Sequence, residues 1–76
     1  MASLTEKFAK YVPNEKAREW MSKTTILSLR ADKARRIVEV TVSFPFLVDK
    51  SDIYFIEDEL CKTYEYNVVK ILRLFL

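Results

Sequence analysis

One stretch of the chain, Arg36–Phe44, gives the clearest strand pattern, with apolar and polar residues alternating from Val38 onward. The apolar set that shares one face of this predicted strand is Val38, Val40, Val42 and Phe44. The preceding segment, Thr24–Ala31, alternates as well, and the run Asp32–Arg35 between the two is typical of a turn in which Asp bonds nearby backbone. Because this turn lacks Gly and Asn, we expect a loop longer than two residues that closes an antiparallel hairpin.

Apolar positions three and four residues apart predict helices before the hairpin. Ser3–Glu6 matches the capping box that begins a helix, and Pro13 ends this helix at or before Val12. A second helix is expected over residues 15–22, where a core position is the favoured interpretation of Trp20 over a binding role.

A third helix and a last strand follow the hairpin. Asp49 or Ser51 caps the helix, which ends near Tyr64. Its apolar stripe is Ile53, Ile56, Leu60 and Tyr64. The last strand is expected over Tyr66–Leu76. The positions expected to face the helices are Val69, Ile71 and Phe75, because Lys70 then stays in water.

These elements predict one α+β domain over residues 1–76, with the order α-α-β-β-α-β and the helices packed on one face of a three-stranded sheet. We expect the strand order 2-1-3, with the last strand beside the first. The chain stops inside the apolar run Ile71–Leu76, so we expect it to be a piece of a longer protein.

The composition narrows the chemistry that this chain can perform. It has no Gly, no His and a single Cys, which excludes glycine-dependent phosphate loops and an ordinary zinc site. Cys61 is interpreted as a small, half-buried apolar residue, and one thiol favours a reducing, cytoplasmic setting. The run Glu57–Glu59 diverges around a helix and is interpreted as a solvated face. We therefore expect no cofactor, no metal, no membrane contact and no catalysis by this chain.

Two groups of side chains remain as candidates for contact with a partner. The basic group surrounds the hairpin turn and consists of Arg30, Lys33, Arg35 and Arg36. It could touch phosphates or an acidic protein, although no aromatic residue is interleaved with it. The apolar group is expected on the sheet face away from the helices and consists of Ile26, Ile37, Leu72 and Leu74. It is either a docking face or a surface covered by a following domain.

The segment from Arg36 to Leu60 resembles the extreme N-terminus of PolC-type DNA polymerase III alpha subunits, the replicative polymerases of low-GC Gram-positive bacteria. The matching positions are Pro45, Ile53-Tyr54, Glu57, Leu60, Tyr64-Glu65-Tyr66 and Val69-Lys70-Ile71. The resemblance covers about residues 5–73, and it rests on the order and spacing of structural positions. The ending Leu72–Leu76 is more apolar than the family leads us to expect.

The resemblance implies a parent protein that joins deoxynucleotides and carries a proofreading exonuclease and a PHP domain, all outside these residues. It also implies a fold like the C-terminal domain of the clamp-loader tau subunit and a truncated KH-like fold. Its implied work is replisome assembly through protein contact. Because the glycine-containing clamp of KH domains is missing, nucleic-acid binding is not implied with the fold. Binding to nucleic acid through the basic turn remains the alternative hypothesis.

Overall fold

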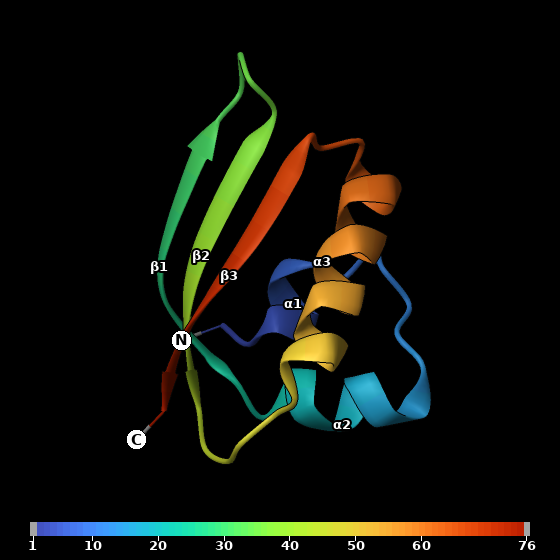
Figure 1. The fold of residues 1–76 in the computed structure, drawn as a ribbon, viewed down its shortest axis with the longest axis vertical. Helices are drawn as coiled ribbons and strands as arrows, with labels where there is room; N and C mark the ends of the chain where they lie inside the picture. The colour runs from blue at the N-terminus through green and yellow to red at the C-terminus, as the bar shows by residue number, and fades with distance from the viewer. Residues whose placement is uncertain (1, 76) are drawn as a thin grey trace.

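The computed structural model describes residues 2–75, without the side chain at position 75, so the expectations for Leu76 and for the inward face of Phe75 lie outside it. The elements are α1 (Leu4–Lys7), α2 (Glu15–Ser22), β1 (Thr25–Asp32), β2 (Ile37–Phe44), α3 (Lys50–Tyr64) and β3 (Val68–Phe75). All three helices lie on one side of the sheet (Figure 1). The predicted α+β class and element order are confirmed.

The sheet has the order β1-β2-β3, in which β1 is antiparallel and β3 is parallel to the central β2. The predicted order 2-1-3 is therefore wrong. Burial gives the reason, because alternate positions of β2 are fully enclosed whereas β1 is exposed from Leu27 to Asp32. The strand with the most apolar face gains most from neighbours on both sides.

The core lies between the sheet and the helices. The predicted inward positions of β2 and β3 are confirmed, namely Val38, Val40, Val42, Phe44, Val69 and Ile71. The α3 stripe is confirmed as well, with Ile53, Ile56 and Leu60 buried and Tyr64 half-buried. Trp20 is 4% exposed and packs 5.9 Å from Phe44 between ring centroids, so the interpretation of Trp20 as a core residue is confirmed.

Helix α1 begins as predicted but ends early. The Ser3 hydroxyl accepts a hydrogen bond from the Glu6 N–H at 3.2 Å, and the Ser3 N–H donates to the Glu6 carboxylate at 3.3 Å. Phe8 then leaves helical geometry at φ −108° and ψ 50°, so the helix ends before Val12, as predicted, but five residues short of it. The backbone N–H of Lys10 donates instead to the Tyr64 hydroxyl at 3.1 Å, which draws this segment onto α3.

Strand β1 contains a β-bulge, because its pairing with β2 shifts between Ile26 and Ser28. The extra residue, Leu27, changes the faces of everything before it. Ile26 lies opposite Val42 and packs against the core, so its expected place on the outer sheet face is wrong. The sequence around Leu27 has no Gly or other sign of a bulge.

The outer edge of β3 is partly closed by α3. The Glu57 carboxylate, half-buried on the helix, accepts a hydrogen bond from the Ile71 N–H at 2.7 Å. The interpretation of Glu57–Glu59 as a wholly solvated face is therefore wrong for Glu57, whereas Asp58 is exposed and pairs with Lys62 at 3.0 Å. Glu57 satisfies a backbone donor that an edge strand would otherwise leave unpaired.

The first prediction concerns this edge bond. Glu57→Ala should lower the free energy of unfolding by about 1–3 kcal/mol, since a half-buried N–H loses its charged acceptor. Glu57→Gln keeps a carbonyl acceptor and should lose less than half as much. Asp58→Ala, next to it but exposed, should change stability by about 0.5 kcal/mol or less. Urea unfolding measures all three, and equal losses for Glu57→Ala and Asp58→Ala would contradict a structural role for the bond.

Candidate hairpin groove

The hairpin turn is built by Asp32. Its carboxylate accepts a hydrogen bond from the Arg35 N–H at 3.1 Å and lies 3.8 Å from the Arg35 Nε. This is the predicted bond from Asp to nearby backbone, and the turn is longer than two residues, as expected. Arg36 returns the chain to β2 through left-handed backbone geometry, with φ at 56°.

The end of this turn is fastened to the start of β3 by Asn67. The Asn67 backbone N–H donates to the Arg36 carbonyl at 2.7 Å, and the Asn67 side-chain amide donates to the Arg35 carbonyl at 2.8 Å. The contact exists because β3 runs parallel to β2, so Val68 begins beside Ile37. Two segments that are far apart in the sequence thereby hold one another in place.

A groove of about 370 Å³ lies between the hairpin and the end of α3. We call it the hairpin groove. Its lining is Ala31, Asp32, Lys33, Arg36, Ile37, Val38, Tyr64, Glu65 and Tyr66. The volume falls within the usual range for ligand pockets, and the lining mixes apolar, aromatic and charged groups.

Two tyrosines form the helix side of the groove. The rings of Tyr64 and Tyr66 are stacked, with centroids 5.8 Å apart and planes 12° from parallel. Phe8 meets Tyr64 edge-on at 5.6 Å, and the Lys10 ammonium lies 5.8 Å from the Tyr64 centroid. Tyr64 is thus fixed by neighbours on several sides, which gives the groove a rigid wall.

Backbone strain is concentrated at this groove. Within residues 2–75, the residues other than Gly that have positive φ are Arg36 and Glu65, and both line it. Glu65 has φ 59° and ends α3 at a position where Gly is usual. A left-handed residue with a Cβ costs roughly 1–2 kcal/mol, and such residues cluster at functional sites.

The four predicted basic residues do not converge on one point. Lys33 and Arg36 line the groove, whereas Arg35 is engaged by Asp32. Arg30 lies on the opposite face of the sheet, directly across from Glu39. The basic side chains of the turn therefore face different directions, and only Lys33 and Arg36 border the groove.

The outer sheet face is less apolar than predicted. A row of charge crosses it, because Glu39 lies between Arg30 on β1 and Lys70 on β3. Leu72 and Leu74 share this face with Ile37, but the row separates them from it, and Ile26 is on the other face. The predicted docking group is therefore divided into a pair of leucines and Ile37, which lies beside the exposed Val68.

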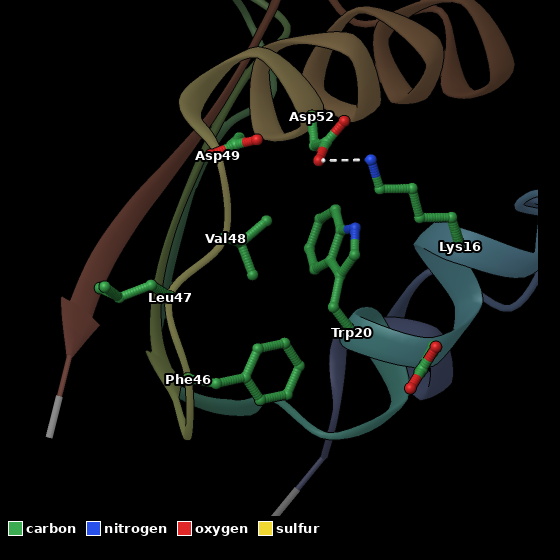
Figure 2. A pocket seen from close by; sticks show the side chains of 8 residues that line it. Lys16, Trp20, Phe46, Leu47, Val48, Asp49 and Asp52 are labelled. Carbon is green, nitrogen blue, oxygen red and sulfur yellow. Dashed lines mark ion pairs between the residues drawn. The ribbon is translucent and has the colours of Figure 1, made fainter.

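A second recess of about 300 Å³ lies between α2 and the start of α3. Figure 2 shows Phe46 and Val48 pointing toward Trp20, and Leu47 pointing away. The Lys16 ammonium pairs with the Asp52 carboxylate at 3.3 Å across one side. The recess has an apolar floor and a charged rim, on which Lys16 pairs with Asp52 and Glu19 pairs with Lys23.

The resolved pKa shifts lie outside the hairpin groove. Burial raises the pKa of Tyr11, and the negative charge of Glu59 adds to this effect. A hydrogen bond to Asp58, with the charge of that carboxylate, raises the pKa of Lys62.

Within residues 2–75, no set of three His, Cys, Asp or Glu side chains converges well enough to hold a metal ion. No helix in the same range is long and apolar enough to cross a bilayer.

Sequence reasoning missed Tyr64, Tyr66 and Asn67 as parts of the site. Tyr64 was assigned to the end of the third helix and Tyr66 to the start of the last strand, and their proximity to Lys33 depends on β3 lying beside β2. No aromatic residue is near the basic turn in the sequence, but these two tyrosines lie near it in the structure. Asn67 was placed inside the predicted strand, and nothing in the sequence indicated its bonds to the turn.

The second prediction concerns the strained wall of the groove. Glu65→Gly should raise the free energy of unfolding by about 1 kcal/mol, because Gly adopts positive φ without a Cβ clash. Arg18→Gly, at an exposed position inside α2, should lower it by a similar amount, about 1 kcal/mol. Chemical denaturation of both variants is the measurement. A loss of stability in Glu65→Gly would mean that contacts of the Glu65 side chain outweigh the backbone strain.

Comparisons with protein-family models, with curated proteins and with solved structures found no match to this chain. The resemblance to PolC-type polymerases, and through it to the tau domain and the KH-like fold, thus stays a prediction.

Proposed function

We propose that this chain is a non-catalytic protein-interaction module at the N-terminus of a PolC-type replicative DNA polymerase and helps to assemble the replisome in the cytoplasm. The polymerase and exonuclease activities would belong to other parts of the parent protein. The sequence resemblance supports the family, and the geometry of the hairpin supports the kind of work.

The observation that carries the proposal is the exposed strand β1 together with the hairpin tip. The tip extends beyond the helices, which pack over β2 and β3 (Figure 1). Leu27 is 44% exposed and Leu29 is 38% exposed on a strand that no helix covers. Apolar side chains on a rigid, projecting arm are suited to bury surface against another protein.

The charge of the hairpin groove favours a protein partner over a phosphate chain. Lys33 and Arg36 are balanced along its lining by Asp32 and Glu65. Nucleic-acid affinity depends mainly on uncompensated cations that displace counterions from phosphates. A groove with balanced charge and tyrosine walls resembles the core and rim of a protein interface more closely.

A second candidate function, contact with single-stranded nucleic acid, is supported by one observation. Tyr64 and Tyr66 line the same groove as Lys33 and Arg36. Aromatic stacking beside cations is the common way to hold unpaired bases without sequence preference. This arrangement supplies the aromatic component that the sequence order alone did not place there.

The third prediction tests docking. Purified clamp-loader, primase and helicase proteins of a low-GC Gram-positive bacterium are titrated into the isotopically labelled chain. We expect amide shifts on β1 and the hairpin turn with at least one of them. Leu29→Glu should weaken that binding by at least about tenfold, because it places a charge in an apolar contact.

Two further variants keep this test interpretable. Leu29→Thr retains a strand-forming side chain and should give an intermediate loss, which guards against a folding defect in Leu29→Glu. Val12→Glu changes a more exposed apolar residue outside the hairpin and should leave binding unchanged. Absence of binding to every replisome protein, or equal losses in Leu29→Glu and Val12→Glu, would overturn the proposal.

The fourth prediction separates the two functions by salt. Docking as the main function predicts no groove shifts when single-stranded DNA is added at low or at physiological salt. Nucleic-acid contact predicts shifts at Lys33, Arg36 and Tyr66 that fade with salt, by about 0.7 in log affinity per log salt for each phosphate. Tyr66→Leu would then weaken binding while Tyr54→Leu, on exposed α3 surface, would not. Such a result would make the nucleic-acid function the better one.

A further inference from the structure

Each edge of the sheet has one occupied backbone group, and the two edges differ in how exposed they are. At the β3 edge, the Ile71 N–H is occupied by the Glu57 carboxylate. At the β1 edge, the Ile26 N–H is occupied by the Ala2 carbonyl at 2.9 Å. Among residues 2–75, this is the last backbone hydrogen bond on the outer side of β1. The outer edge of Ser28–Asp32 is therefore open. Alternate backbone groups of an open edge strand are free to pair with another chain.

This open stretch is accessible along its outer edge and from both faces of the sheet, because β2 covers only its inner edge. All residues of Ser28–Asp32 are exposed, and neither sheet face is covered over them. The stretch spans about 17 Å at a strand rise of 3.4 Å per residue, enough for a short added strand. The Leu27 bulge and the Ala2 contact limit pairing at one end, and the turn limits it at the other.

Charge indicates the chemistry of the added strand. Arg30 lies at the centre of the open stretch, and Lys33, Arg35 and Arg36 follow at its end. Opposite charges on directly paired strands are favourable, and like charges are not. A second copy in a two-fold antiparallel pair centred on this stretch would place Arg30 against Arg30, so a second copy is a poor occupant.

We propose that Ser28–Asp32 receives an extended acidic segment of a partner protein as a fourth strand of the sheet. This inference rests on the proposed docking function and specifies how the partner is held. Main-chain hydrogen bonds supply the pairing, acidic side chains meet the basic residues, and Leu29 offers an apolar contact on the helix-side face.

The fifth prediction uses a synthetic peptide as the probe. An acetylated, amidated heptapeptide of alternating Glu and Val is titrated into the labelled chain. We expect amide shifts confined to 28–32 and the turn, with cross-strand nuclear Overhauser contacts to β1. The same peptide with alternate amides N-methylated on its pairing edge should bind at least about tenfold more weakly, because its ladder bonds cannot form. A Lys and Val peptide of the same length should not bind.

Matched variants test the charge. Arg30→Gln, Lys33→Gln and Arg35→Gln together should weaken the acidic peptide by at least about tenfold, whereas Lys7→Gln, Arg18→Gln and Lys50→Gln together should have little effect. Equal binding of the N-methylated peptide, or absence of shifts at 28–32, would overturn strand addition. So would concentration-dependent dimerisation of the chain alone with shifts at 28–32, since it would identify a second copy as the occupant.

The peptide experiment and the replisome experiment test different proposals, so either proposal can be overturned while the other stands. A replisome protein that binds while the acidic peptide leaves 28–32 unshifted would overturn strand addition and leave the docking function intact. A peptide that pairs with β1 while no replisome protein binds would overturn the proposed replisome role and leave the strand-addition site intact.

Discussion

The parallel pairing of β3 with β2 is the constraint on which the site depends. It places Val68 beside Ile37, and so brings Asn67 within hydrogen-bonding distance of Arg35 and Arg36. Without that register, the tyrosines at the end of α3 would have no basic turn beside them. The groove is therefore a consequence of strand order more than of any local motif.

The absence of Gly shapes the same region. The four-residue hairpin turn and the end of α3 both use left-handed backbone, and here Arg36 and Glu65 supply it. Left-handed geometry costs free energy at Arg36 and Glu65, and the same two residues line the groove. Elsewhere the chain follows ordinary rules, such as the Ser3 capping box and the Asn14 cap, whose side chain accepts from the Ala17 N–H at 2.8 Å.

What the sequence could predict was local. Period-two alternation identified the inward face of β2, and helical spacing identified the stripe of α3, because each depends only on neighbours along the chain. Strand order, the Leu27 bulge and the Glu57 bond depend on segments that meet in space. Placing β3 beside β1 followed from treating both strands as equal, although only β2 carries an unbroken series of large apolar residues. Because of this error the groove went unnoticed, whereas the outer face lost Ile26 because of the Leu27 bulge.

The β1 edge of the sheet is more exposed than the β3 edge. A small domain with one short helical layer can cover two strands well, and here these are β2 and β3. The remaining strand, β1, is held to the sheet by its pairing with β2 and by the Ala2 contact, so it stays ordered while exposed. An ordered strand loses little further entropy when a partner pairs with it, whereas a flexible loop of equal length would lose much more. Its bulge and its Arg30 also discourage self-pairing, which are the usual protections of an edge strand. The β1 edge is thus suited to a partner that supplies acidic side chains and unsuited to a second copy of the chain.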